Sequence, residues 1–75
     1  MNNRAREQRE RIENDRARLF SSYLRRGDEL FDTKSMEGYQ FALEQYKLAD
    51  RSMPNQEFVQ EKIRNTQAKL REFSQ

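Results

Sequence analysis

The chain has 75 residues, of which 33% are hydrophobic and 37% are charged, so it forms at most one small domain with a modest core. It contains no Cys and no His, which excludes disulfide bonds and the usual structural zinc sites. The net charge of +2 is uneven, because residues 1–26 hold eight Arg and four acidic residues, whereas the remainder holds seven basic and nine acidic residues. A chain this small needs additional burial, and we expect self-association or docking onto a larger assembly to supply it.

The residue types predict an all-α fold. Two Gly and one Pro leave few turn signals, while Glu, Gln, Arg, Leu and Ala favour helices. No apolar segment reaches ten residues, so we expect neither a secretory signal nor insertion into a membrane, and we predict a cytoplasmic location.

Residues 4 to about 32 are predicted to form one long helix with two distinct parts. In its C-terminal part, apolar and small residues recur at helical spacing and predict a packing face: Leu19, Phe20, Tyr23, Leu24, Gly27, Leu30 and Phe31. Before residue 19 the apolar pattern of this face fades, because the corresponding positions are Arg16, Ile12, Arg9 and Ala5. We therefore divide the chain into an Arg/Glu-rich helical extension, residues 1–18, and a three-helix unit, residues 19–75. A shorter helix capped near Asn14 is the alternative.

A turn at residues 32–35 is predicted to separate the first helix from a second that runs to about Ser52. Ser35 is the expected N-cap, and Glu37 suits the positive end of the helix dipole. The main face of this helix alternates large and small residues, which favours close packing: Tyr39, Ala42, Leu43, Tyr46, Ala49 and Met53.

Pro54 closes the second helix, and Asn55 is the expected N-cap of a third helix that runs to about Phe73. Its apolar residues are predicted to share one face that packs against the first two helices: Phe58, Val59, Ile63, Thr66, Leu70 and Phe73.

The middle of the chain resembles a tetratricopeptide repeat, a helical hairpin of about 34 residues. The resemblance covers residues 23–54 and rests on Tyr23, Leu24, Gly27, Leu30, Phe31, Tyr39, Ala42, Leu43, Tyr46, Ala49 and Pro54. It implies one degenerate repeat followed by a capping helix, and a scaffold that binds other proteins. It also implies that four residues of the first helix face a ligand: Ser21, Leu24, Asp28 and Phe31.

Phe41 and Leu48 lie two helical turns apart, on the side of the second helix opposite its main face. One hypothesis places them at the centre of a dimer or partner interface. The alternative is an ordinary pair of exposed apolar residues.

The Arg-rich N-terminal segment suggests a second kind of partner. Nucleic-acid phosphates are possible contacts of Arg4, Arg9, Arg11, Arg16 and Arg18. The four interleaved acidic residues weaken this interpretation, and a solvated helical face or a protein partner, including another copy of the helix, remains open.

Catalysis has no evident basis in the sequence. The chain lacks His, Cys and a Gly-rich phosphate loop, and its carboxylates alternate with Arg and Lys. We therefore expect no enzyme activity and no cofactor. The predicted function is protein-protein interaction within a larger assembly or homo-oligomer.

Overall fold

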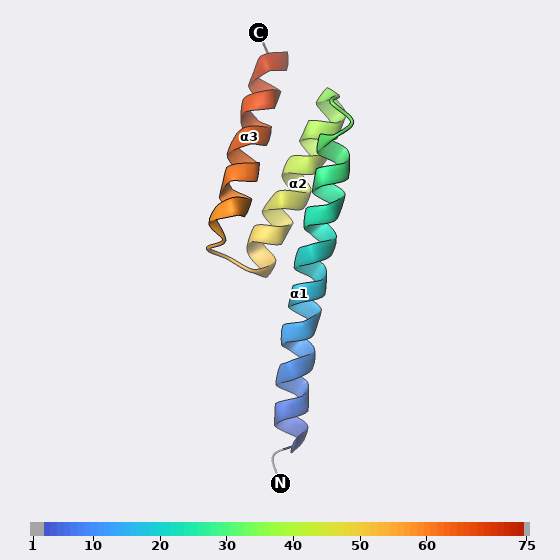
Figure 1. The fold of residues 1–75 in the computed structure, drawn as a ribbon, viewed down its shortest axis with the longest axis vertical. Helices are drawn as coiled ribbons and strands as arrows, with labels where there is room; N and C mark the ends of the chain where they lie inside the picture. The colour runs from blue at the N-terminus through green and yellow to red at the C-terminus, as the bar shows by residue number, and fades with distance from the viewer. Residues whose placement is uncertain (1–2, 75) are drawn as a thin grey trace.

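Three helices and no strand make up residues 3–74, the part of the chain that the computed structural model describes, with side chains described for residues 15–74. The helices are α1 (Asn3–Phe31), α2 (Met36–Ser52) and α3 (Glu57–Phe73), as Figure 1 shows. The predicted all-α fold with three helices is therefore confirmed.

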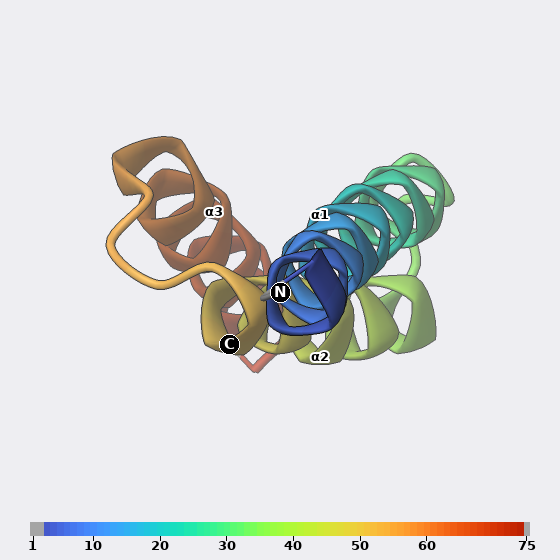
Figure 2. The same ribbon diagram turned by 90° about the horizontal axis from the view of Figure 1, so that it is seen from below.

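The three helices run alternately up and down, with α2 antiparallel to both of its neighbours (Figure 1). Viewed along the helices, α1 and α3 both lie on one side of α2, and its other side is left uncovered (Figure 2). The N-terminal half of α1 extends beyond the ends of α2 and α3 (Figure 1). The bundle therefore has one side on which α1 and α3 flank α2 and an opposite side formed by α2 alone.

The core is centred on the predicted main face of α2. Tyr39, Ala42, Tyr46 and Ala49 are buried, and Leu43 is half-buried. Large and small residues alternate along this face, so neighbouring helices approach closely at the alanines. This prediction is confirmed.

Gly27 of α1 packs directly against the Tyr46 ring of α2. A Cβ atom placed there would lie 2.5 Å from Cε1 of Tyr46, a distance that no real side chain tolerates. The buried Tyr46 ring therefore occupies space that only Gly leaves free.

Contacts between aromatic rings connect all three helices near the C-terminal end of α1. The Phe31 ring meets the Tyr39 ring edge-on with centroids 5.0 Å apart, and the Phe73 ring lies 5.9 Å from Tyr39. Such pairs contribute about 0.5–1.5 kcal/mol each beyond their buried area.

The α1–α2 turn follows the prediction. The Ser35 side chain accepts a hydrogen bond from the backbone N–H of Gly38 at 3.0 Å, and Glu37 lies in the first turn of α2. Ser35 is thus confirmed as the N-cap. Lys34 adopts a φ of 53°, in the left-handed region, to complete the turn.

The prediction for the start of α3 was wrong. Asn55 has a φ of 70° and belongs to the turn after Pro54, so it cannot cap the helix. Gln56 is the N-cap residue, and its side chain makes no capping hydrogen bond. The left-handed backbone at Asn55 shifts the start of α3 by one residue. Residue types that are typical of N-caps do not reveal such a shift.

The apolar face of α3 is only partly buried. Val59 and Thr66 are fully buried, and the Thr66 hydroxyl donates a hydrogen bond to the Lys62 carbonyl at 2.7 Å. Phe58 is 46% exposed and Phe73 is 51% exposed, because both lie at the margins of the contact with α1 and α2. Burial of the predicted face is therefore confirmed at its centre, at Val59 and Thr66, whereas Phe58 and Phe73 at its edges are more exposed than expected.

Candidate binding groove between α1 and α3

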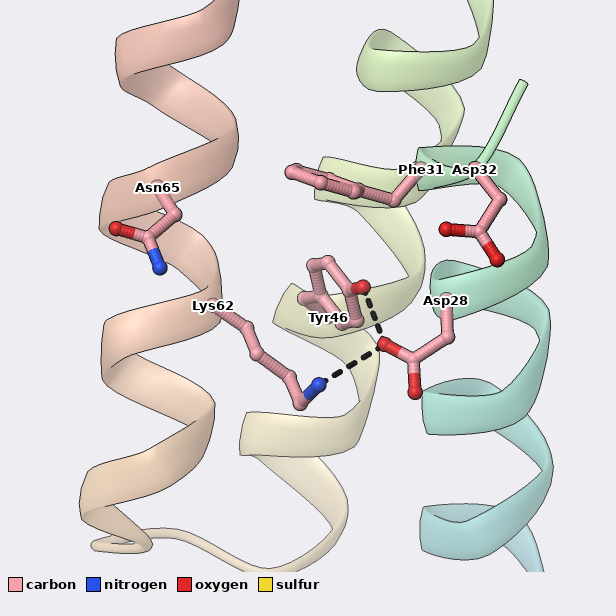
Figure 3. Close-up of a pocket in the computed structure, with 6 residues that line it drawn as sticks. All are labelled: Asp28, Phe31, Asp32, Tyr46, Lys62 and Asn65. Carbon is pink, nitrogen blue, oxygen red and sulfur yellow. Dashed lines mark hydrogen bonds and ion pairs between the residues drawn. The ribbon is translucent and has the colours of Figure 1, made fainter. Parts of the chain in front are cut away.

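A groove of about 390 Å³ lies between α1 and α3, above α2. Residues from all three helices line it: Asp28, Phe31, Asp32, Tyr46, Lys62 and Asn65 (Figure 3). We call this feature the α1–α3 groove. Asp28 belongs to α1 and Asp32 to the turn that follows it, whereas the aromatic floor comes from α1 and α2 and the amine and amide come from α3.

The floor of the groove is organised by Asp28. Its Oδ1 atom accepts a hydrogen bond from the Tyr46 hydroxyl at 2.5 Å and forms an ion pair with Lys62 Nζ at 3.0 Å (Figure 3). Lys62 Nζ also lies 5.7 Å from the centroid of the Tyr46 ring. Three side chains, one from each helix, are thereby held in one arrangement.

The electrostatic environment keeps Tyr46 protonated. Burial of its side chain raises the pKa of the phenol well above its ordinary value, and the hydrogen bond to Asp28 and the negative charges of Asp28 and Asp32 raise it further. The Tyr46 hydroxyl is therefore a fixed hydrogen-bond donor at neutral pH, not a base or a nucleophile.

Asp32 is the carboxylate in the groove that remains available. It lies one helical turn after Asp28, and among the described residues its side chain forms no hydrogen bond or ion pair. The Asp28–Lys62 pair is partly exposed and contributes at most about 1 kcal/mol to folding. Two carboxylates and one amine give the lining a net charge of −1, next to the Phe31 ring.

These features suit the binding of a cationic side chain better than chemical transformation of a substrate. A guanidinium or ammonium group can pair with Asp32 and lie against an aromatic ring. Among the described side chains, those of residues 15–74, no group of three or more potential metal-ligating residues is found.

The structure divides the six predicted partner-binding residues into three groups. Asp28 and Phe31 line the α1–α3 groove. Ser21 is exposed and Leu24 half-buried on α1, and neither lines the groove. Phe41 is exposed and Leu48 half-buried on α2.

The sequence analysis missed Asp32, Lys62 and Asn65 as groove residues. Asp32 had been assigned only to a turn, and Tyr46 only to the core. The three-residue spacing of Lys62 and Asn65 puts them on one face of α3. No local signal shows that this face would meet Asp28, which is 34 residues earlier.

The five predicted nucleic-acid contacts divide into two groups. Arg16 and Arg18 are exposed on α1. The side chains of Arg4, Arg9 and Arg11 lie outside the described residues, so their predicted role stays a prediction.

No helix among the described residues has both the length and the hydrophobicity that crossing a membrane requires. Comparisons of the chain with protein-family models, curated proteins and solved structures gave no match.

Proposed function

We propose that this chain is a non-enzymatic protein-interaction module whose α1–α3 groove binds a short segment of another protein. The observation that carries the proposal is the groove itself, with an aromatic floor fixed by Asp28 and an unpaired carboxylate at Asp32. Pockets of this kind bind through buried apolar contact and a few well-placed polar groups.

The proposal includes a tetratricopeptide-like organisation for residues 19–75, with residues 1–18 as a charged extension. The close contact of Gly27 with Tyr46 supports it, as does the burial of Ala42 and Ala49. The position of α3 beside the hairpin is also in keeping with a capping helix.

The groove favours a segment with a basic residue next to an apolar one. Its Arg or Lys pairs with Asp32, and the neighbouring apolar side chain packs on Phe31. Because Asp28 is already paired with Lys62, Asp32 supplies most of the discrimination between basic and neutral peptides.

The test is selection from a peptide-display library, followed by affinity measurements on the selected peptides. We expect enrichment of Arg or Lys, and at least tenfold weaker binding to an Asp32→Lys variant. Glu29→Lys is the matched control, because Glu29 is also exposed on α1 but does not line the groove. Equal losses of peptide affinity in the two variants, or a library selection without enrichment of Arg or Lys, would contradict the proposal.

Nucleic-acid binding by α1 is the second candidate. Four described Arg side chains on this helix are exposed, namely Arg16, Arg18, Arg25 and Arg26. The helix also extends beyond its neighbours, so a nucleic acid can reach it (Figure 1).

Salt dependence separates the two candidates. Binding of a random-sequence RNA probe through phosphates weakens steeply as salt rises, and Arg16→Gln with Arg18→Gln reduces the slope by up to about 2. Binding that hardly responds to salt would exclude this second function.

A further inference from the structure

We propose that a second copy of this chain docks, antiparallel, on the uncovered side of α2. Both other helices lie on the opposite side of α2, as the view along the bundle shows (Figure 2). The uncovered side presents five residues at alternating intervals of four and three, which we call the α2 seam: Glu37, Phe41, Glu44, Leu48 and Arg51. This spacing is the one by which paired helices pack side by side.

The seam is available for contact. Phe41 is 53% exposed although it is one of the largest apolar side chains in the protein. Leu48 borders a surface hollow of about 390 Å³ that is also lined by Glu44, Lys47 and Arg51. Among the described residues, none of the charged side chains of the seam forms an ion pair.

The charged residues of the seam favour a second copy of α2 in antiparallel orientation as the partner. Glu37 lies at the N-terminal end and Arg51 at the C-terminal end, about 21 Å apart. A second α2 in antiparallel orientation puts Glu37 of each copy opposite Arg51 of the other. A parallel arrangement would put Glu37 against Glu37 and Arg51 against Arg51, which is repulsive.

The apolar residues of the seam also pair in the antiparallel arrangement, which is related by a two-fold axis. With the two-fold axis near Glu44, Phe41 of each copy meets the Leu48 hollow of the other copy. The exposed Glu44 side chains of the two copies then face each other at the axis, and the two Glu37–Arg51 pairs offset this single repulsion. A two-fold interface uses the same patch on both subunits. The seam suits such an interface because Glu37 meets Arg51, and Phe41 meets Leu48, when a second copy of α2 runs in the opposite direction.

The inference deepens the proposed function, because the module would act as a homo-oligomer, but it concerns a different face from the groove. The α2 seam shares no residue with the groove lining. The Asp32→Lys variant leaves the seam intact and the variants below leave the groove intact. Failure of one proposal is therefore distinguishable from failure of the other.

The experiment measures molecular mass by sedimentation equilibrium from roughly 10 µM to 1 mM, the range expected of a small interface. We expect a monomer-dimer equilibrium that Phe41→Asp abolishes, with unchanged helicity by circular dichroism. Monomer mass throughout for the unmodified chain would overturn the proposal.

Charge reversal tests the antiparallel direction. Glu37→Lys and Arg51→Glu each turn two symmetry-related attractive pairs into repulsive ones, so each is expected to weaken the dimer by about tenfold. The double variant restores both pairs and the affinity. Glu61→Lys, the same charge change on an exposed position of α3, is the control. Failure of the double variant to recover affinity would overturn the antiparallel pairing.

Discussion

The contact between Gly27 and Tyr46 shows how one residue sets the distance between two helices. The Tyr46 ring is only 2% exposed, and its hydroxyl is tied to Asp28, so the ring cannot move aside for an added methyl group. Gly normally costs about 1 kcal/mol relative to Ala within a helix. Its presence in α1 is explained by the space it leaves for Tyr46.

We predict that Gly27→Ala destabilises the protein by about 1–2 kcal/mol, because the overpacking cost exceeds the gain in helix propensity. The measurement is urea unfolding followed by circular dichroism. In a Tyr46→Leu background the ring atoms are gone, so the same substitution is expected to stabilise by up to about 1 kcal/mol. A destabilisation of equal size in both backgrounds would show that Tyr46 is not the obstacle.

The raised pKa of Tyr46 predicts loss of stability in alkali. The folded state keeps the phenolic proton above pH about 10, where an unfolded tyrosine releases it. The stabilisation is therefore fully present below pH about 10 and declines above it, by up to about 1.4 kcal/mol per pH unit.

Tyr46→Phe removes this titration. We expect the variant to be less stable at pH 7, since it loses the hydrogen bond to Asp28, but to lose less stability than the unmodified protein above pH about 10. Urea midpoints measured across this range provide the test. If the urea midpoints of the two proteins differed by the same amount at every pH, the loss of stability in alkali would not come from Tyr46.

At the scale of the elements, α2 and α3 have the same length but begin differently. The first turn of α2 is closed by the Ser35 side chain, whereas Gln56 leaves the first turn of α3 without a side-chain cap. Both cap residues have extended backbone angles that suit a capping side chain. The start of α3 is therefore the weaker helix end.

A pair of substitutions at the two caps tests this difference. Ser35→Ala should destabilise by about 1 kcal/mol, because it removes the acceptor for the Gly38 N–H. Gln56→Ser should stabilise by a similar amount, because it supplies an acceptor where none is present. Thermal unfolding of both variants is the measurement. A loss of stability in Gln56→Ser would show that the backbone N–H groups at the N-terminal end of α3 already have hydrogen-bond partners.

At the scale of the whole molecule, α1 is much longer than the helices it packs against. Arg16 and Ala17 of α1 border a hollow together with Ser52 and Met53 at the C-terminal end of α2. The preceding part of the helix extends past the bundle (Figure 1).

We predict that deleting residues 1–14 changes the free energy of unfolding by less than about 0.5 kcal/mol, as for other changes outside packed regions. The new N-terminus then places Asp15 in the first turn, where a negative charge is favourable. The measurement is urea unfolding of the full and shortened chains. A loss of more than about 2 kcal/mol would show that the extension packs against the bundle.

Residue periodicity was sufficient to predict the three helices and the centre of the core. Apolar residues at intervals of three and four predicted the buried face of α2, because burial requires them to share one side of a helix. Ser35 was predictable because capping depends on a hydrogen bond between neighbours in the chain. The Asn55 prediction failed because the left-handed turn after Pro54 shifts the helix start, and residue type alone does not reveal backbone angles.

Which polar residues meet depends on how the helices pack against one another. Asp28, Tyr46 and Lys62 converge because α1 and α3 lie on the same side of α2, and nothing in the local pattern of any one helix specifies that arrangement. The same packing leaves the opposite side of α2, with Phe41, open. Periodicity determines which face of a helix is apolar, whereas the relative placement of helices depends on packing between residues far apart in the chain.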